Sequence, residues 1–275
     1  MKRFLRSTFF KIIAALALVI IAILISNLLG LIALIAFFIY VFNLTKVGLY
    51  TNIGNIKHGR GNLKSAVKWY RRASKCKRAK PGIAISYSYL LLKSGMVEEA
   101  DKALRAIDTS KLHEYDRIMH VSNSALVLWK KDDLDGAITL LENYSTEKNT
   151  LILGSLGYFL ILKGDLDKAL SYNLDAYQYN GADMVIRDNL GLNYYYLGDY
   201  PKAEEIYESM IKAKIKPGFP VAYYDYALVL IALEKFDKAK EYLKKTSGFN
   251  LNFLSSVTKE QIDERLKEIE EKLKK

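Results

Sequence analysis

The residues with the most potential for metal chemistry are three histidines, two of which lie close together in this 275-residue chain. Residues 113–117 read HEYDR and resemble the H-E-x-x-H zinc motif, but Arg117 stands where the second histidine ligand belongs. His113 and His120 are seven residues apart and share a face if that segment is helical. Two ligands without a third make a weak metal site, so we expect no bound metal.

A glycine-rich segment and one thiol are the other candidates for chemistry. Gly54, Gly59 and Gly61 are spaced as in a phosphate loop, but the lysine and the hydroxyl residue of that motif are missing and no strand precedes it. We interpret Gly59-Arg60-Gly61 as a turn between helices instead. Cys76 is the single cysteine, so no intrachain disulfide can form. Nothing here favours an enzyme, and we predict neither a catalytic residue nor a cofactor.

Positive charge is concentrated near the N-terminus. Residues 1–80 carry 15 of the 41 lysine and arginine residues, and the first acidic residue is Glu98. A predicted helix in this region carries a basic face, made of Lys64, Lys68, Arg71, Arg72 and Lys75. Such a face binds anionic lipid headgroups or RNA phosphates, or it only keeps its flank in the cytoplasm. We expect membrane lipids rather than nucleic acid, because the excess charge ends soon after an apolar segment.

That apolar segment covers residues 12–42, which are 31 residues without a charge. One helix of that length would be about 46 Å long, whereas the hydrocarbon core of a bilayer is about 30 Å thick. We therefore predict two short spans, about 5–25 and 28–44, with Ser26-Asn27 and Gly30 at the turn. Both flanks are basic, which places both in the cytoplasm. The alternatives are a single signal anchor and a cleaved signal peptide, although no A-x-A-like cleavage site follows.

Small residues recur along the rest of the chain at spacings of 32 to 37 residues. They are Ala66, Ala100, Ala137, Ala169, Ala203 and Ala239. Twelve residues before each of them lies a second small residue, namely Gly54, Ser88, Ala125, Gly157, Gly191 and Ala227. A period in this range indicates stacked helical hairpins, in which small residues allow the helices to approach closely.

These residues resemble the tetratricopeptide repeat, whose pattern is W-x2-L-G-x2-Y followed by A-x3-F. The clearest copies read Leu156-Gly157-x2-Leu160 with Ala169, and Leu190-Gly191-x2-Tyr194 with Ala203. The resemblance covers residues 47–253 in about six copies. It implies an all-α fold, a right-handed solenoid of helix pairs that presents surfaces to partners. Asp or Asn before an apolar residue, as in Asp165-Leu166, predicts the N-caps of the second helices.

In this family the first helix of each repeat lines a concave face that binds peptides. The positions so implied for a partner-binding groove are Asn55, Tyr89, Trp129, Tyr158, Asp188, Tyr195, Tyr196 and Tyr224. Copy one has Thr51 where family members with a carboxylate clamp have a lysine, so we do not expect a chaperone C-terminus as the ligand. Tyrosine and tryptophan are strong anchors, and they favour an apolar or helical ligand.

A charged segment follows the last repeat. Thr258-Lys259-Glu260-Gln261 is a capping-box pattern, and an apolar stripe follows at Ile262, Leu266, Ile269 and Leu273. We therefore predict three regions, which are a membrane anchor at 1–46, a repeat array at 47–253 and a C-terminal capping helix at 254–275.

Together these features predict an integral cell-membrane protein whose repeat array lies in the cytoplasm and holds a protein or peptide partner. Anchoring would raise the local concentration of that partner near other membrane components. One alternative is a self-assembling structural component of the membrane, which would form a homo-oligomer. The other is an array that binds RNA or anionic lipid through its basic first repeat.

Overall fold

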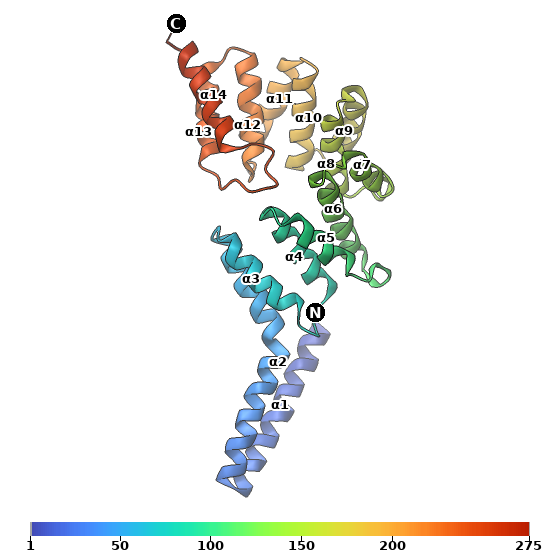
Figure 1. Ribbon diagram of the computed structural model, residues 1–275, viewed down its shortest axis with the longest axis vertical. Helices are drawn as coiled ribbons and strands as arrows, with labels where there is room; N and C mark the ends of the chain where they lie inside the picture. The colour runs from blue at the N-terminus through green and yellow to red at the C-terminus, as the bar shows by residue number, and fades with distance from the viewer. Residues whose placement is uncertain (1, 275) are drawn as a thin grey trace. The chain divides into compact units, whose positions relative to one another are not determined.

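The computed structural model describes residues 2–274, and every regular element within them is a helix (Figure 1). The prediction of an all-α fold is therefore confirmed for the described part of the chain. The helices belong to two compact units, residues 1–83 and 84–275. The first unit contains α1 (Lys2–Ile25), α2 (Asn27–Gly59) and α3 (Leu63–Ser74).

The second unit begins at Ala84, inside α4, and consists mainly of helix pairs. The first and second helices of these pairs are α4 (Pro81–Lys93) and α5 (Val97–Arg105), α6 (Glu114–Lys130) and α7 (Leu134–Glu142), α8 (Thr150–Lys163) and α9 (Leu166–Asn180), α10 (Met184–Tyr196) and α11 (Tyr200–Lys212), and α12 (Pro220–Ala232) and α13 (Phe236–Ser247). The 3-10 turns η1 (Thr109–Lys111) and η2 (Ser145–Glu147) follow α5 and α7, and the last helix is α14 (Lys259–Lys272).

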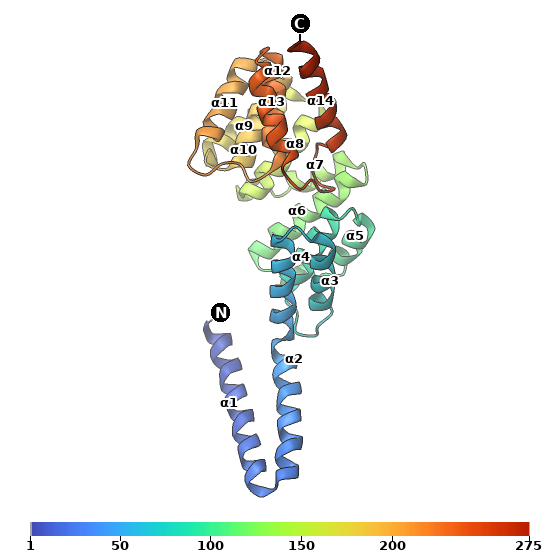
Figure 2. The ribbon, with the colours of Figure 1, turned by 90° about the vertical axis from the view of Figure 1, so that its left-hand side faces the viewer.

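In the first unit, α1 and α2 form an antiparallel hairpin (Figure 2). The chain reverses at Ser26, whose backbone is extended with φ −163° and ψ 138°. Gly30 does not belong to this turn, contrary to the sequence-based expectation. It lies inside α2, where an added Cβ would be 2.5 Å from Cγ1 of Ile23. Its role is therefore to let the two helices approach closely, as small residues do between packed helices.

The helices of this hairpin are long and apolar enough to cross a membrane, over Thr8–Ile25 and Asn27–Gly59. Only 6% of each apolar window is buried, and a side chain such as Leu24 is 80% exposed. Apolar surface of this extent is unfavourable in water, so the hairpin is compatible with a membrane anchor. With 33 residues, α2 is also longer than one crossing requires, and its C-terminal part serves as the first helix of the first repeat.

Each repeat turns between its two helices through one residue with a left-handed backbone. This residue is Gly61, Gly95, Gly164 or Gly198 in four repeats and Asp132 or Glu234 in the other two. In four turns the next residue caps the second helix by accepting a hydrogen bond from a backbone N–H three residues later. These capping residues are Asn62, Asp133, Asp165 and Asp199, which confirms the N-cap prediction for them.

Glu234 is the least suitable residue for such a turn, so its replacement by glycine is expected to stabilise the protein. Its φ of 58° costs a residue with a Cβ about 1 kcal/mol, and glycine avoids that cost. Thermal unfolding of the full chain, followed by circular dichroism, should shift upward by a few degrees in Glu234→Gly. The matched control is Gly198→Ala, which should lose a similar amount. An unchanged midpoint in Glu234→Gly would contradict this explanation.

The two columns of small residues lie where the helices of each repeat meet. All six alanines of the second-helix column are fully buried, with 0% exposure. In the first-helix column, a Cβ at Gly54 would be 2.6 Å from the Tyr70 ring, and one at Gly191 would be 2.7 Å from the Tyr207 ring. The spaces left by small residues are thus filled by rings from the second helix, as dense packing requires.

Buried asparagine side chains link successive first helices. Asn123 of α6 donates from Nδ2 to the carbonyl oxygen of Ile85 in α4 at 3.0 Å. Asn189 of α10 donates in the same way to Gly154 in α8 at 2.7 Å. Both asparagines lie two residues before the small residue of their own first helix. Asp225 occupies the corresponding position in α12, and a carboxylate cannot donate such a bond.

The C-terminal helix begins as its capping box predicts. Thr258 and Gln261 exchange hydrogen bonds at 2.8 and 3.3 Å, which confirms the motif. Ile262 and Ile269 are buried against the last repeat. The helix itself is Lys259–Lys272, within the region 254–275 that was predicted to hold it. Residues 249–258 form a separate irregular segment, here named the strap, which leaves α13 and returns to α14 (Figure 1).

Candidate functional site

Successive first helices of the second unit pack side by side. Contacts join α6 to α8, α8 to α10 and α10 to α12, and the Asn123 bond joins α4 to α6. We call the surface of these five helices the first-helix face. Most of the predicted groove residues lie on it, with Tyr89 37% exposed and Tyr196 52% exposed. Four other aromatic residues on this face are half-buried: Trp129, Tyr158, Tyr195 and Tyr224.

Two of the predicted groove residues are placed differently. Asn55 lies in the first unit, where it is exposed and accepts a hydrogen bond from the Tyr70 hydroxyl at 2.6 Å. Asp188 is only 6% exposed, so its carboxyl is not an accessible groove residue. Thr51, the position that excluded a carboxylate clamp, donates its hydroxyl to the Val47 carbonyl of its own helix at 3.0 Å.

The strap binds to the first-helix face at the second and third repeats. The backbone N–H of Phe253 donates to the carbonyl oxygen of Lys93, at the end of α4, over 3.2 Å. The Phe253 ring lies against Gly95, where an added Cβ would be 3.3 Å from it. The ammonium of Lys130 lies 5.0 Å from the centre of this ring and 3.7 Å from the centre of the Trp129 ring. The cation is thus held between an aromatic residue of the face and one of the strap.

Further contacts continue along the face. Burial raises the pKa of Tyr158 to about 12, although a hydrogen bond with the Ser256 hydroxyl of the strap lowers it in part. Burial also raises the pKa of Tyr224, whose hydroxyl interacts with Arg265 of α14. Residues of the strap and of α14 therefore reach four of the five first helices, namely α4, α6, α8 and α12.

The strap has a defined local conformation. Asn252 accepts a hydrogen bond from the N–H of Leu254 at 3.0 Å with its side chain, and one from the N–H of Ser255 at 2.8 Å with its carbonyl. Val257 is 2% exposed, and the Phe249 ring stacks on Tyr223 with 5.5 Å between centres. No periodic pattern marks this segment, so the sequence does not predict it. The one local signal is an asparagine followed by a serine at turn spacing.

Comparison with known proteins identifies the repeats. Tetratricopeptide repeat family models match residues 47–79 and 189–246. The protein carries tetratricopeptide repeats. A tetratricopeptide repeat protein from Parabacteroides merdae ATCC 43184 has a similar crystal structure, with a TM-score of 0.66 at 15% identity, covering 93% of this chain and 98% of that one. The predicted family and the solenoid of helix pairs are thereby confirmed.

A second solved structure with this fold is the Cut9–Hcn1 hetero-tetramer of the APC/C. It matches with a TM-score of 0.59 at 14% identity, over 80% of this chain and 42% of that one. No curated protein matches the sequence. Proteins with tetratricopeptide repeats are generally scaffolds for protein–protein interaction rather than enzymes. The likeness to these two solved structures, at 14 to 15% identity, concerns the fold alone.

The tetratricopeptide array also buries two carboxyl groups close together. Asp188 of α10 and Asp225 of α12 are each 6% exposed. Burial raises the pKa of Asp188 to about 7, and burial together with the neighbouring Asp188 raises that of Asp225 well above its ordinary value. Within the described residues, one carboxyl oxygen of each has no hydrogen-bond partner. The pair therefore retains a proton near neutral pH, because two adjacent buried carboxylates repel each other.

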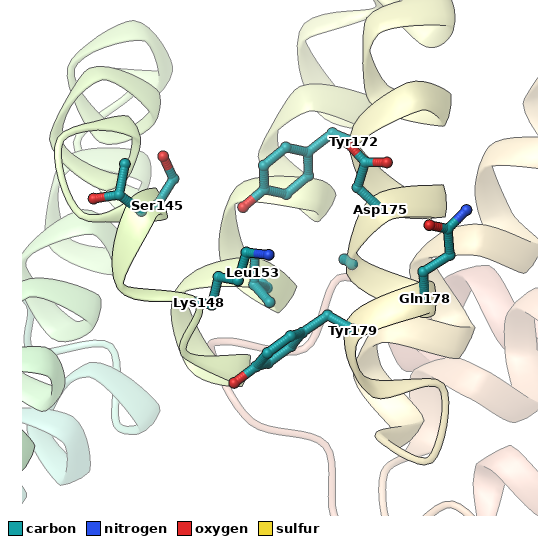
Figure 3. Close-up of a pocket in the computed structure, with 9 residues that line it drawn as sticks. Ser145, Lys148, Leu153, Tyr172, Asp175, Gln178 and Tyr179 are labelled. Atoms are coloured by element: carbon teal, nitrogen blue, oxygen red, sulfur yellow. The ribbon is translucent and has the colours of Figure 1, made fainter.

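A polar cleft of about 590 Å³ lies beside the second helix of the fourth repeat (Figure 3). The rings of Tyr172 and Tyr179 extend from α9 towards the loop that carries Ser145 and Lys148. The Lys148 ammonium is 5.8 Å from the centre of the Tyr179 ring. These groups offer hydrogen bonds, and Leu153 of α8 also lines the cleft.

The basic face of the first repeat is largely accessible to solvent in the described structure. Only part of this face lines a cleft against α2. Arg72 and Lys75 line that cleft, and the other three residues of the face do not. Sequence reasoning did not place Lys46, Lys77 and Arg78 at this cleft, since the contact depends on how α3 packs against α2.

The two histidines do not form a metal site with other residues. His120 has its Nε2 3.2 Å from the carbonyl oxygen of Leu104, which ties α6 to α5, and His113 precedes the first residue of α6. Among residues 2–274, no three His, Cys, Asp or Glu side chains gather in a way that could hold a metal ion. The glycine-rich segment is the end of α2 and the turn that follows, with Gly61 at φ 73°.

Proposed function

We propose that this protein is a membrane-anchored scaffold that binds a non-helical segment of a partner protein on its first-helix face. The observation that carries the proposal is the strap. The face holds this non-helical segment, which turns at Asn252–Ser255, through a backbone hydrogen bond to Lys93 and through the Lys130–Phe253 contact. Both interactions are open to any non-helical peptide segment that offers a backbone N–H and an aromatic side chain.

The strap also regulates access in this proposal. A partner competes with Phe253 and Ser256 for the same positions on α4, α6 and α8. The apparent affinity of the partner equals its intrinsic affinity multiplied by the fraction of molecules whose strap is released, so a bound strap weakens partner binding. The mechanism is positional, since the anchor raises the concentration of the bound partner near other membrane components.

The membrane part of the proposal is supported by the N-terminal hairpin and its charges. Two apolar helices precede the array, and basic residues flank the hairpin on both sides. Positive flanks are retained in the cytoplasm, so both ends of the hairpin and the whole array belong there.

Site-specific photocrosslinking in native membranes tests the first-helix face. A crosslinking amino acid is placed at Tyr89 or Tyr196, and the matched controls carry it at Tyr179 of α9 or at Ile215 between α11 and α12, which are 52% and 77% exposed outside the first helices. We expect one partner from the face positions and none from the controls. Phe253→Ala should increase the yield several-fold by releasing the strap. Equal crosslinking from the controls, or crosslinks only to another copy of this chain, would contradict the proposal.

Membrane anchoring is tested separately by extraction and protease access. The protein should stay in the pellet after alkaline carbonate treatment. A C-terminal tag should resist protease in intact spheroplasts and be digested in inverted vesicles. Release by carbonate, or digestion in spheroplasts, would refute the anchor or its orientation.

A further inference from the structure

The first unit contains a cleft of about 650 Å³ between α2 and the end of α3. One wall comes from α2, and the other comes from the C-terminal end of α3 and the residues after it. The lining residues are Phe42, Asn43, Lys46 and Tyr50 on the first wall, and Arg72, Lys75, Cys76, Lys77 and Arg78 on the second. Neither the repeat fold nor the first-helix face accounts for this site.

Five cationic side chains line this cleft, and residues 1–83 contain no acidic side chain that could neutralise them. The first acidic residue of the chain is Glu98, which lies outside the unit formed by residues 1–83. The C-terminal end of α3 contributes about half a negative charge, which opposes an anion only weakly against five positive charges. The net potential in the cleft is therefore strongly positive, and its complement is a compact, multiply oxygenated anion such as a phosphate group.

Aromatic rings form the side of the cleft nearest to the apolar hairpin. Phe42 and Tyr50 meet edge to face with 6.3 Å between their centres, and Tyr50 lies 5.6 Å from Trp69. The guanidinium of Arg72 stands 4.6 Å from the centre of the Trp69 ring, which holds this side chain in place. Tryptophan and tyrosine are enriched at the membrane–water interface, where lipid phosphates lie.

The position of the cleft along α2 matches that level. Phe42 is the last residue of the apolar segment 12–42, and Lys46 is the first cation after it. Phe42 is 46% exposed, and the apolar residues before it on α2 are exposed as well, such as Phe38 and Ile39. An acyl chain can therefore lie along α2 while its headgroup reaches the cations.

We infer that this cleft binds the phosphate of an anionic phospholipid headgroup. The guanidinium of Arg72 offers paired donors to two phosphate oxygens, and the lysines around it contribute point charges. The inference rests on the membrane anchoring proposed above. RNA would satisfy the cations but not the adjoining exposed apolar helix, so RNA binding is an outcome of the test rather than the expectation.

Native mass spectrometry of the full chain in mixed micelles of phosphatidylcholine and phosphatidylglycerol tests the site. The variant Arg72→Gln/Lys75→Gln/Lys77→Gln removes three charges from the cleft. The matched control Arg60→Gln/Lys64→Gln/Lys68→Gln removes three charges from the same unit outside it. Phosphatidylglycerol retention should fall about tenfold or more in the cleft variant and change little in the control. Equal losses in both variants would mean diffuse surface charge and would overturn the site, as would unchanged retention in the cleft variant.

Two further measurements separate the sources of phosphate. Millimolar inorganic phosphate should not displace the bound lipid, and displacement would identify a soluble phosphate ligand and overturn the inference. Binding of labelled single-stranded RNA that is lost in the cleft variant, while lipid retention is unchanged, would overturn it in favour of RNA. Carbonate extraction distinguishes the two proposals. A chain that stays in the membrane but does not retain phosphatidylglycerol would refute the lipid site and leave the membrane anchor intact.

Discussion

Replacement of Asp225 by asparagine is expected to stabilise the repeat array by about 2 kcal/mol at neutral pH. Asn123 and Asn189 occupy the corresponding position in two other repeats, and each donates a buried hydrogen bond to the preceding first helix. Asp225 places a carboxyl there beside the buried carboxyl of Asp188. The substituted amide would supply a donor at every pH and would remove the need for this buried pair to bind a proton, in a single change of nearly constant volume.

The pH dependence of stability provides the sharper readout. Burial raises the pKa of Asp188 from 3.8 to about 7 and raises that of Asp225 as well. The folded state therefore binds more protons than the unfolded state between about pH 4 and pH 7, and stability falls as the pH rises through this window. Thermal unfolding of the full chain in mild detergent should show this decline in the natural protein and a flatter profile in Asp225→Asn.

The matched control for this prediction is Asp199→Asn. Asp199 is a partly exposed helix cap whose pKa is lowered by its hydrogen bond with Lys202, so its contribution has the opposite sign and is lost as the pH falls. A profile that is equally steep in Asp225→Asn and in the natural protein would show that the buried pair does not set the pH dependence.

Replacement of Gly157 by alanine is expected to destabilise the fourth repeat by about 3 kcal/mol. A Cβ on Gly157 would collide with Oδ1 of Asn173 and lie 3.1 Å from Nδ2 of Asn189. Both side chains are buried, and Asn173 donates to Oδ1 of Asn193 at 3.1 Å. The methyl group must therefore break or strain a buried hydrogen-bonded network, which outweighs the gain of about 1 kcal/mol in helix propensity.

A double-mutant cycle identifies the cause. Asn173→Ala removes the atom that the new methyl would strike, so Gly157→Ala should cost much less in that background than in the natural protein. The open-space control is Gly48→Ala, because a Cβ there would meet no atom within 4 Å. Denaturant unfolding of the full chain measures all four variants. Additive losses in the cycle would contradict the steric explanation.

The strap changes how the aromatic residues of the first-helix face are understood. In the sequence they indicate anchors for an apolar or helical ligand, but Trp129 and Tyr158 contact Lys130 and Ser256 beside an irregular, turned segment of the same chain. A non-helical partner segment with an aromatic side chain is therefore the better match. The sequence could not indicate this, because the contacts join residues of the second to fourth repeats to residues beyond the sixth.

Local chemistry alone made the repeat architecture predictable. A glycine or alanine twelve residues before a buried alanine can be recognised from the sequence alone, since the close helix contact excludes larger side chains at both positions. The N-caps at Asp133 and Asp165 and the Thr258 capping box were predictable for the same reason, because each depends on residues three positions apart.

By itself, therefore, the sequence determined the helical repeats, their register and the apolar hairpin, because each follows from periodicity and spacing within a short segment. Only the tertiary structure decided that the strap covers the first-helix face, that Asp188 meets Asp225, and that Lys46 and Arg72 line one cleft. These sites bring together side chains from different helices. Their positions depend on how whole helices stack, and no local pattern encodes that packing.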